Sequence, residues 1–153
     1  MTNKKFIRRD ILKLAVAGTT VALIPLPAFA STRNAKKNGI AIKGYDTTSY
    51  FQNGKAKRGA KSTVVEWNGA KWNFATTAEA DMFRANPTSF APQFGGFCTR
   101  AMSFKKIVHG DPEVWRIRGK KLYLFARPVG RDFFDKDPDA MIAKAKAHWN
   151  TLS

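Results

Sequence analysis

The dipeptide Asn68-Gly69 is the sequence feature that most constrains this fold, because it separates two runs of aromatic and β-branched residues. The first run covers residues 63–67 and the second covers residues 70–74. Asparagine and glycine both tolerate the positive φ angles of a tight two-residue hairpin turn. The chain is therefore predicted to form an antiparallel β-hairpin over residues 63–74.

A second hairpin is predicted where Gly119-Lys120 separates residues 114–118 from residues 121–125. Side chains alternate between the two faces of a strand. The alternation places Trp115 and Ile117 toward a core, and the arginines beside them toward water.

Helix signals occupy the remaining segments. Thr76 and Glu79 are spaced as a capping box, and the following helix is expected to end at Asn86-Pro87. A short helix is predicted over residues 129–136. A last helix begins with Asp137 as its cap and proline in its first turn, and its apolar residues recur at helical spacing.

This order of elements predicts the fold class. A hairpin, a helix, a loop, a second hairpin and further helices are typical of a small α+β domain. The hydrophobic content of 44% and the charged content of 25% are those of a globular protein, and 153 residues suit a single domain. We therefore expect one small domain in which two antiparallel β-hairpins pack with three or four short helices.

Residues 1–30 have the three parts of an export signal: a basic start, an apolar stretch and the small-x-small sequence Ala28-Phe29-Ala30. The adjacent Arg8 and Arg9 are typical of a twin-arginine signal, which export machinery reads on a folded protein. An ordinary secretory signal with a chance arginine pair is the alternative. We expect cleavage after Ala30 and a soluble periplasmic product. Residues 31–42 are then a flexible basic arm, and residues 43–152 form the domain.

The net charge of the whole chain is +16, and residues 31–153 keep 22 Lys+Arg against 10 Asp+Glu. Basic residues cluster at 55–61, 105–106 and 116–121. No groove-reading nucleic-acid motif accompanies these clusters, and the periplasm holds little nucleic acid, so no nucleic-acid partner is expected. A basic face that meets anionic lipid headgroups or an acidic partner is the better interpretation.

Cys98 is the only cysteine, which excludes an intrachain disulfide and a thiolate-only zinc site. It follows Gly95-Gly96, whose backbone freedom could present the thiol at a tight turn. A soft metal ligand or a redox thiol is one interpretation, and a small buried hydrophobe is the other.

His109 and Met102 are the candidate partners of Cys98 in a copper or zinc site. The alternatives are a loop histidine bonded to backbone and a methionine that only packs. A Cys98–His109 hydrolase would need a third orienting group, which the sequence does not identify. Catalytic activity is therefore not expected.

Several short motifs between about residues 40 and 152 carry a family resemblance. They are Gly44-Tyr45-Asp46, Glu66-Trp67-Asn68-Gly69, Trp72-Asn73-Phe74, the segment 90–98 with its Gly-Gly-Phe-Cys end, Gly110-Asp111-Pro112, Lys121-Leu122-Tyr123-Leu124 and Trp149. In these motifs the chain resembles the exported bacterial YHS-domain proteins.

The resemblance implies a metal-binding accessory protein, with copper or zinc as the metal. Relatives often carry two cysteines, at positions that correspond here to the neighbourhood of Ser49 and to Ala75, so this chain lacks that pair. Cys98 belongs to the segment typical of the exported subgroup, and His109 stands where that subgroup has proline. A non-catalytic module that binds an anionic partner or membrane surface through its basic face is the alternative function.

Overall fold

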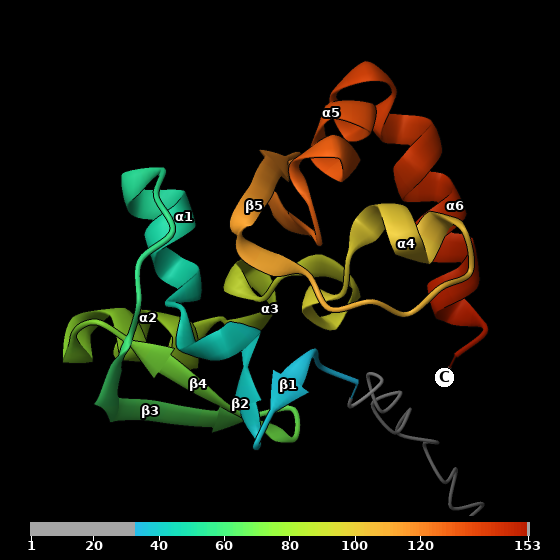
Figure 1. Cartoon of the computed structure of the whole chain (residues 1–153). Helices are drawn as coiled ribbons and strands as arrows, with labels where there is room; N and C mark the ends of the chain where they lie inside the picture. The colour runs from blue at the N-terminus through green and yellow to red at the C-terminus, as the bar shows by residue number, and fades with distance from the viewer. Residues whose placement is uncertain (1–32, 153) are drawn as a thin grey trace, which may run out of the picture.

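The computed structural model describes residues 33–152 of the chain. The elements in that range are β1 (Lys36–Lys37), β2 (Ile40–Ala41), η1 (Ile42–Gly44), α1 (Thr47–Asn53), β3 (Ala60–Trp67), β4 (Ala70–Phe74), α2 (Thr77–Ala85), α3 (Pro87–Phe90), η2 (Gln93–Gly96), α4 (Thr99–Ser103), β5 (Asp111–Arg118), β6 (Lys121–Phe125), α5 (Pro128–Lys136) and α6 (Pro138–Asn150). They are drawn in Figure 1. The predicted α+β class of a small single domain is confirmed.

The first predicted hairpin, β3–β4, forms one side of a four-stranded sheet with the order β1-β2-β4-β3, in which β3 is an edge strand. Its turn has the positive φ angles expected from the sequence, 49° at Asn68 and 71° at Gly69. Helix α2 packs on the sheet through Phe83, whose ring centroid lies 5.4 Å from Trp72 and 5.0 Å from Phe74. These rings are the centre of the first core cluster.

The expectation of a flexible arm over residues 31–42 is wrong for the part that the structure describes. Asn34 and Ala35 are buried, and the residues after them form β1 and β2 at the edge of the sheet. The backbone N–H of Ala35 donates to the carbonyl oxygen of Gly95 at 2.8 Å. Strand β2 then pairs in parallel with β4, opposite Lys71. Backbone hydrogen bonds hold this segment, and its polar composition did not reveal them.

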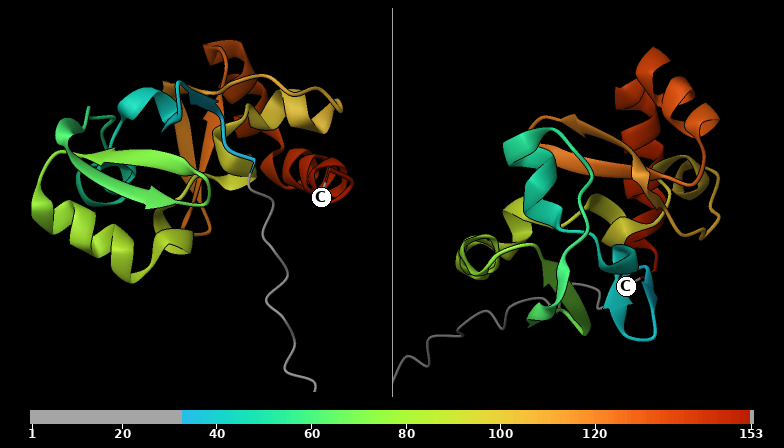
Figure 2. Two further views of the ribbon diagram at one scale, coloured as in Figure 1. Left: turned by 90° about the horizontal axis from the view of Figure 1, so that it is seen from below. Right: turned by 60° about the vertical axis from the view of Figure 1, so that its left-hand side comes forward.

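The second predicted hairpin, β5–β6, lies between two cores. Leu122 and Leu124 of β6 belong to the first core cluster, while Tyr123 and Phe125 belong to the second, with helices α4–α6. Alternating side chains of one strand therefore serve both cores. Figure 2 shows the hairpin, in orange, between the green sheet and the red C-terminal helices.

The helix caps largely follow the sequence. The N–H of Glu79 donates to Thr76 Oγ1 at 3.3 Å, and that hydroxyl also donates to Glu79 Oε2 at 2.9 Å. Asp137 Oδ1 accepts from the N–H of Ala140 at 3.2 Å, so the last helix begins as predicted. Helix α1 was not predicted. Its N-cap is Asp46, a buried carboxylate that accepts from the N–H of Thr48 at 2.8 Å.

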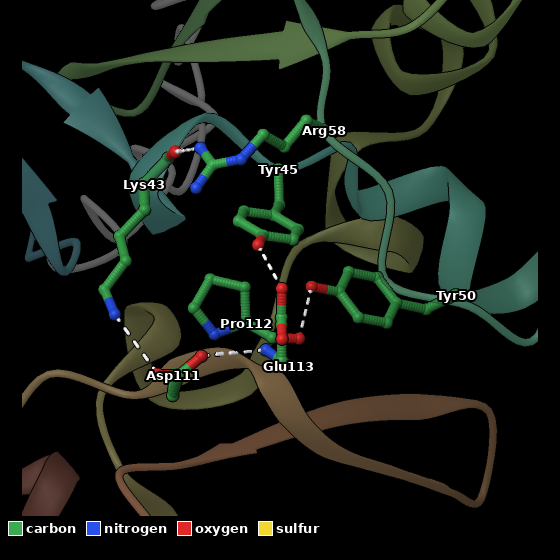
Figure 3. Close-up of polar contacts among 7 residues, drawn as sticks. All are labelled: Lys43, Tyr45, Tyr50, Arg58, Asp111, Pro112 and Glu113. Atoms are coloured by element: carbon green, nitrogen blue, oxygen red, sulfur yellow. Dashed lines mark hydrogen bonds and ion pairs between the residues drawn. The ribbon is translucent and has the colours of Figure 1, made fainter.

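Polar contacts join the segment from η1 to α1 with the start of β5, as Figure 3 shows. Tyr45 donates to Glu113 Oε1 at 2.6 Å, and Tyr50 donates to the carbonyl oxygen of Pro112 at 2.8 Å. Lys43 Nζ forms an ion pair with Asp111 Oδ2 at 3.3 Å. We call this set the inter-segment clamp. It fixes residues 43–50 against the second hairpin.

Candidate functional site

Cys98 lies at the N-cap of α4, where its sulfur accepts a long hydrogen bond of 3.5 Å from the N–H of Ala101. The residue is 5% exposed. It nevertheless lines a pocket of about 300 Å³ between α4, the following loop and the start of α5. The thiol is thus a buried N-cap at the wall of an open pocket. It is buried like a small hydrophobe, yet it borders a space from which a ligand could approach.

His109 lies beside the same backbone but on its other side. Phe97 and His109 form an isolated antiparallel bridge, and their rings meet edge to face with centroids 5.4 Å apart. Successive side chains along extended backbone point to opposite sides. The thiol of Cys98 therefore points away from the side of the imidazole, and Val108 rather than His109 lines the pocket with it.

Met102 is fully buried in the second core cluster, one helical turn after Cys98. Its backbone N–H donates to the carbonyl oxygen of Cys98 at 2.9 Å, and it is not among the residues that line the pocket. Within residues 33–152, no three His, Cys, Asp or Glu side chains are grouped to hold a metal ion. The structure therefore does not bring Cys98, Met102 and His109 to one pocket.

The pocket has a basic rim and an apolar wall. Arg100, Lys106 and Arg127 line it, whereas none of its lining residues is acidic. The Arg100 guanidinium lies over the Phe133 ring, 4.1 Å from its centroid, and also faces Phe104 at 5.7 Å. Cation–π contacts of this kind hold a charged group beside an apolar one at the surface. The rim can attract an anion, and the wall can receive an apolar group.

The large apolar side chains exposed among the described residues gather around this pocket. Their exposed fractions lie between 42% and 63%, and they are Phe104, Ile107, Val108, Val129 and Phe133. Three of them line the pocket, and Phe133 joins it through Arg100. We define the α4–α5 surface as these five residues together with Arg100, Lys105, Lys106, Arg127 and Lys136.

The positive charge of the α4–α5 surface is not neutralised by neighbouring carboxylates. Within residues 33–152, no ion pair involves Arg100, Lys105, Lys106 or Arg127.

Another predicted basic cluster differs, because its two arginines are paired. Arg116 forms an ion pair with Asp135 at 2.6 Å, and Arg118 pairs with Asp139 at 2.8 Å. The hydrogen bond and ion pair with Asp139 raise the pKa of Arg118 further. Arg58, in the remaining cluster, lies over the Tyr45 ring. The three basic clusters of the sequence therefore differ in how far neighbouring carboxylates neutralise their charge.

The sequence predicts Lys105 and Lys106 as a basic cluster but does not single out the exposed apolar residues around them. The signal was present in residues 104–108, where Phe, Ile and Val flank the lysine pair outside any predicted helix or strand. The contribution of α5 could not be found this way, because its residues reach the same surface only through tertiary packing.

The predicted signal residues Arg8 and Arg9, and the cleavage position after Ala30, lie outside the described residues. No helix within residues 33–152 has the length and apolar character to cross a bilayer. A search of protein-family models, of curated proteins and of solved structures found no match to this chain. The fold and the site thus define a small α+β protein with a basic and apolar surface pocket. The resemblance to exported YHS-domain proteins stays a prediction.

Proposed function

We propose that this protein is an exported, non-catalytic interaction module that binds an anionic partner through the α4–α5 surface. The single observation that carries the proposal is the gathering there of the exposed large apolar side chains of the described chain, among cations without acidic partners. Contiguous apolar patches on a soluble protein commonly mark interaction sites. Unneutralised cations give such a site a preference for negative charge.

The chemistry of the pocket supports a binding role over a catalytic one. A cysteine nucleophile is normally activated by a base within hydrogen-bond reach. The groups around Cys98 in the pocket are arginine, lysine and apolar side chains, and the His109 ring is turned toward Phe97. These groups can hold an anion but cannot accept a proton from the thiol.

Two charge-reversal variants test the proposal, in the chain that begins at Ser31. The double variant Lys105→Glu and Lys106→Glu alters the α4–α5 surface, whereas Lys55→Glu and Lys57→Glu makes the same charge change in the segment between α1 and β3. All four lysines are exposed, so both variants should fold.

Binding to two probes, soluble polyglutamate and vesicles that contain phosphatidylglycerol, is measured at rising salt concentration. We expect the first variant to lose binding to at least one probe and the second to keep most of it, with screening by salt in each case. Equal losses of binding in the two double variants would show that binding depends only on the net charge of the protein, and would contradict the proposal.

Metal binding at Cys98 is a second candidate, favoured by the position of the sulfur at a pocket wall. A thiolate is a ligand for copper(I) or zinc. The test is the copper and zinc content of purified protein, compared between wild type and Cys98→Ser, in which serine keeps the N-cap. Equal metal content would remove Cys98 as a ligand.

Export by the twin-arginine machinery to the periplasm is part of the proposal and is tested separately. The conservative variant Arg8→Lys with Arg9→Lys keeps the charge of the signal but removes the pair that the export receptor reads. We expect the uncleaved chain to accumulate in the cytoplasm. The N-terminal sequence of the exported wild-type protein tests cleavage after Ala30.

A further inference from the structure

We propose that the α4–α5 surface docks on a lipid bilayer that carries anionic headgroups. This inference rests on the proposed function and names its partner. The docked protein would lie at the bilayer surface, with apolar side chains of two chain segments entering the interface. The cations around those side chains would meet the headgroup phosphates.

The apolar side chains of the α4–α5 surface project outward from two neighbouring segments. Phe104 and Ile107 are 63% and 50% exposed, so about half or more of each side chain is outside the fold. They project from the end of α4 and its following loop, while Val129 and Phe133 project from α5, which packs against α4. Apolar side chains at neighbouring positions can enter a bilayer interface together, and the favourable transfer grows with their buried area.

The cations of the α4–α5 surface lie among these apolar side chains. Arg100 covers the Phe133 ring, and Lys136 Nζ lies 5.1 Å from the same centroid. Long basic side chains at a membrane interface keep their stems beside apolar groups and their charged ends at headgroup level. The contacts of Arg100 and Lys136 already have this arrangement.

The α4–α5 surface has few neutral polar groups. Residues 100–108 and 126–133 contain one hydroxyl side chain, Ser103, and its hydroxyl already donates to the carbonyl oxygen of Arg100 at 2.7 Å. Among these residues Asp132 is the one carboxylate, and it pairs with Arg131. Specific protein interfaces usually carry several direct hydrogen bonds. A surface made mainly of cations and hydrocarbon suits anionic headgroups above acyl chains better than a folded acidic protein.

The position of the pocket means that docking would change the accessibility of Cys98. Cys98 opens to solvent through the pocket that Phe104, Val108 and Val129 line, so docking would cover its entrance. Cys98 is the only thiol in the chain. The rate at which a water-soluble thiol reagent modifies Cys98 should therefore fall on docking, so no label has to be added to the protein to detect it.

Vesicle co-sedimentation tests the inference with the chain that begins at Ser31, because both core clusters lie within residues 35–152 and the apolar export signal would itself enter membranes. One vesicle preparation is phosphatidylcholine alone, and the other also contains phosphatidylglycerol. We expect binding to the anionic vesicles only. We also expect anionic vesicles to slow modification of Cys98 by a water-soluble thiol reagent several-fold.

Two variants separate insertion from simple charge attraction. Phe104→Ser with Ile107→Ser leaves the charge unchanged and is expected to weaken anionic-vesicle binding about tenfold or more, since two large apolar side chains no longer enter the interface. Lys105→Glu with Lys106→Glu is expected to weaken it by a similar factor. The control Lys55→Glu with Lys57→Glu should retain most of the binding. Unchanged thermal unfolding of each variant shows that its fold is intact.

The outcomes distinguish this inference from the proposed function. Binding to polyglutamate through Lys105 and Lys106, without binding to anionic vesicles, would overturn the proposal that the partner is a bilayer. The proposal that the surface binds an anionic partner would still hold. Full vesicle binding by the Phe104 and Ile107 variant would also overturn docking by insertion. Binding to neither probe would overturn both proposals.

Discussion

The phenol of Tyr45 donates a hydrogen bond to Glu113 Oε1 at 2.6 Å, although the two residues are 68 positions apart in the chain. The bond connects the segment after η1 with the start of β5, at the junction of the four-stranded sheet and the second hairpin. It belongs to the inter-segment clamp, which also contains Tyr50 and Lys43. The relative position of the two hairpins therefore depends partly on polar contacts.

We predict that Tyr45→Phe lowers the free energy of unfolding by about 1–2 kcal/mol, because a hydrogen bond to a charged acceptor is lost while the ring still packs. Urea unfolding of Tyr45→Phe, Glu113→Ala and the double variant gives the coupling energy between the two residues. Losses that simply add in the double variant would show that the bond contributes no stability.

The stability of the protein is predicted to fall as the pH rises above about 10. The hydrogen bond to Glu113 and burial raise the pKa of Tyr45, and burial raises the pKa of Tyr50 and of Tyr123. The unfolded chain, with ordinary pKa values near 10, loses these protons first. The native state then binds more protons, so the free energy of unfolding decreases with pH. Below a pH of about 10 the tyrosines are protonated in both states, and their full contribution to the free energy of unfolding is present.

Denaturant unfolding between pH 8 and about pH 11 measures this dependence, with the ultraviolet absorbance of tyrosinate as a second signal. Tyr50→Phe should show a shallower decrease than the wild type, because it removes the tyrosine with the strongest burial. The native protein should show little tyrosinate at pH of about 10, where the unfolded chain is half ionised. Early tyrosinate absorbance in the folded protein would contradict the prediction.

Gly95→Ala is predicted to destabilise the protein by at least about 3 kcal/mol. A Cβ at this position would overlap the carbonyl oxygen of Arg33, and the residue has a φ of +60°. Gly119→Ala is a matched control, because its φ is +55° but no atom lies within 4 Å of the added Cβ. The control should lose only about 1–2 kcal/mol for the left-handed backbone. Similar losses in thermal unfolding would mean that residues 33–35 do not pack against Gly95.

Unfolding is predicted to be a single cooperative transition, because β6 supplies side chains to both cores. Leu124→Ala should cost about 2–5 kcal/mol and Phe125→Ala about 3–5 kcal/mol. Trp72 reports the first core and Trp149 lies at the edge of the second. In each of two variants that keep Trp72 or Trp149 as the sole tryptophan, fluorescence and far-ultraviolet circular dichroism should therefore give the same midpoint. Different midpoints from the two signals within one variant would show that the two cores unfold independently.

Local sequence was sufficient where structure depends on neighbouring residues. Asn68-Gly69 determines its turn by its tolerance of positive φ, and Thr76 and Asp137 cap their helices by bonds that span three residues. Helix α1 was missed although Asp46 precedes it, because its cap lies among turn residues and its apolar spacing is short. The packing of residues 34–41 could not be predicted, since it depends on contacts with Gly95 and β4.

The sequence by itself determined both hairpins, the main helix boundaries, the single thiol and the excess of positive charge, because each follows from residue type and short spacing. Only the tertiary structure decided what surrounds Cys98. Backbone alternation turned His109 to the other side, and the packing of α4 against α5 joined apolar and basic residues that lie about 30 positions apart. The partners of a side chain across such distances are set by packing, and no local pattern in the sequence records them.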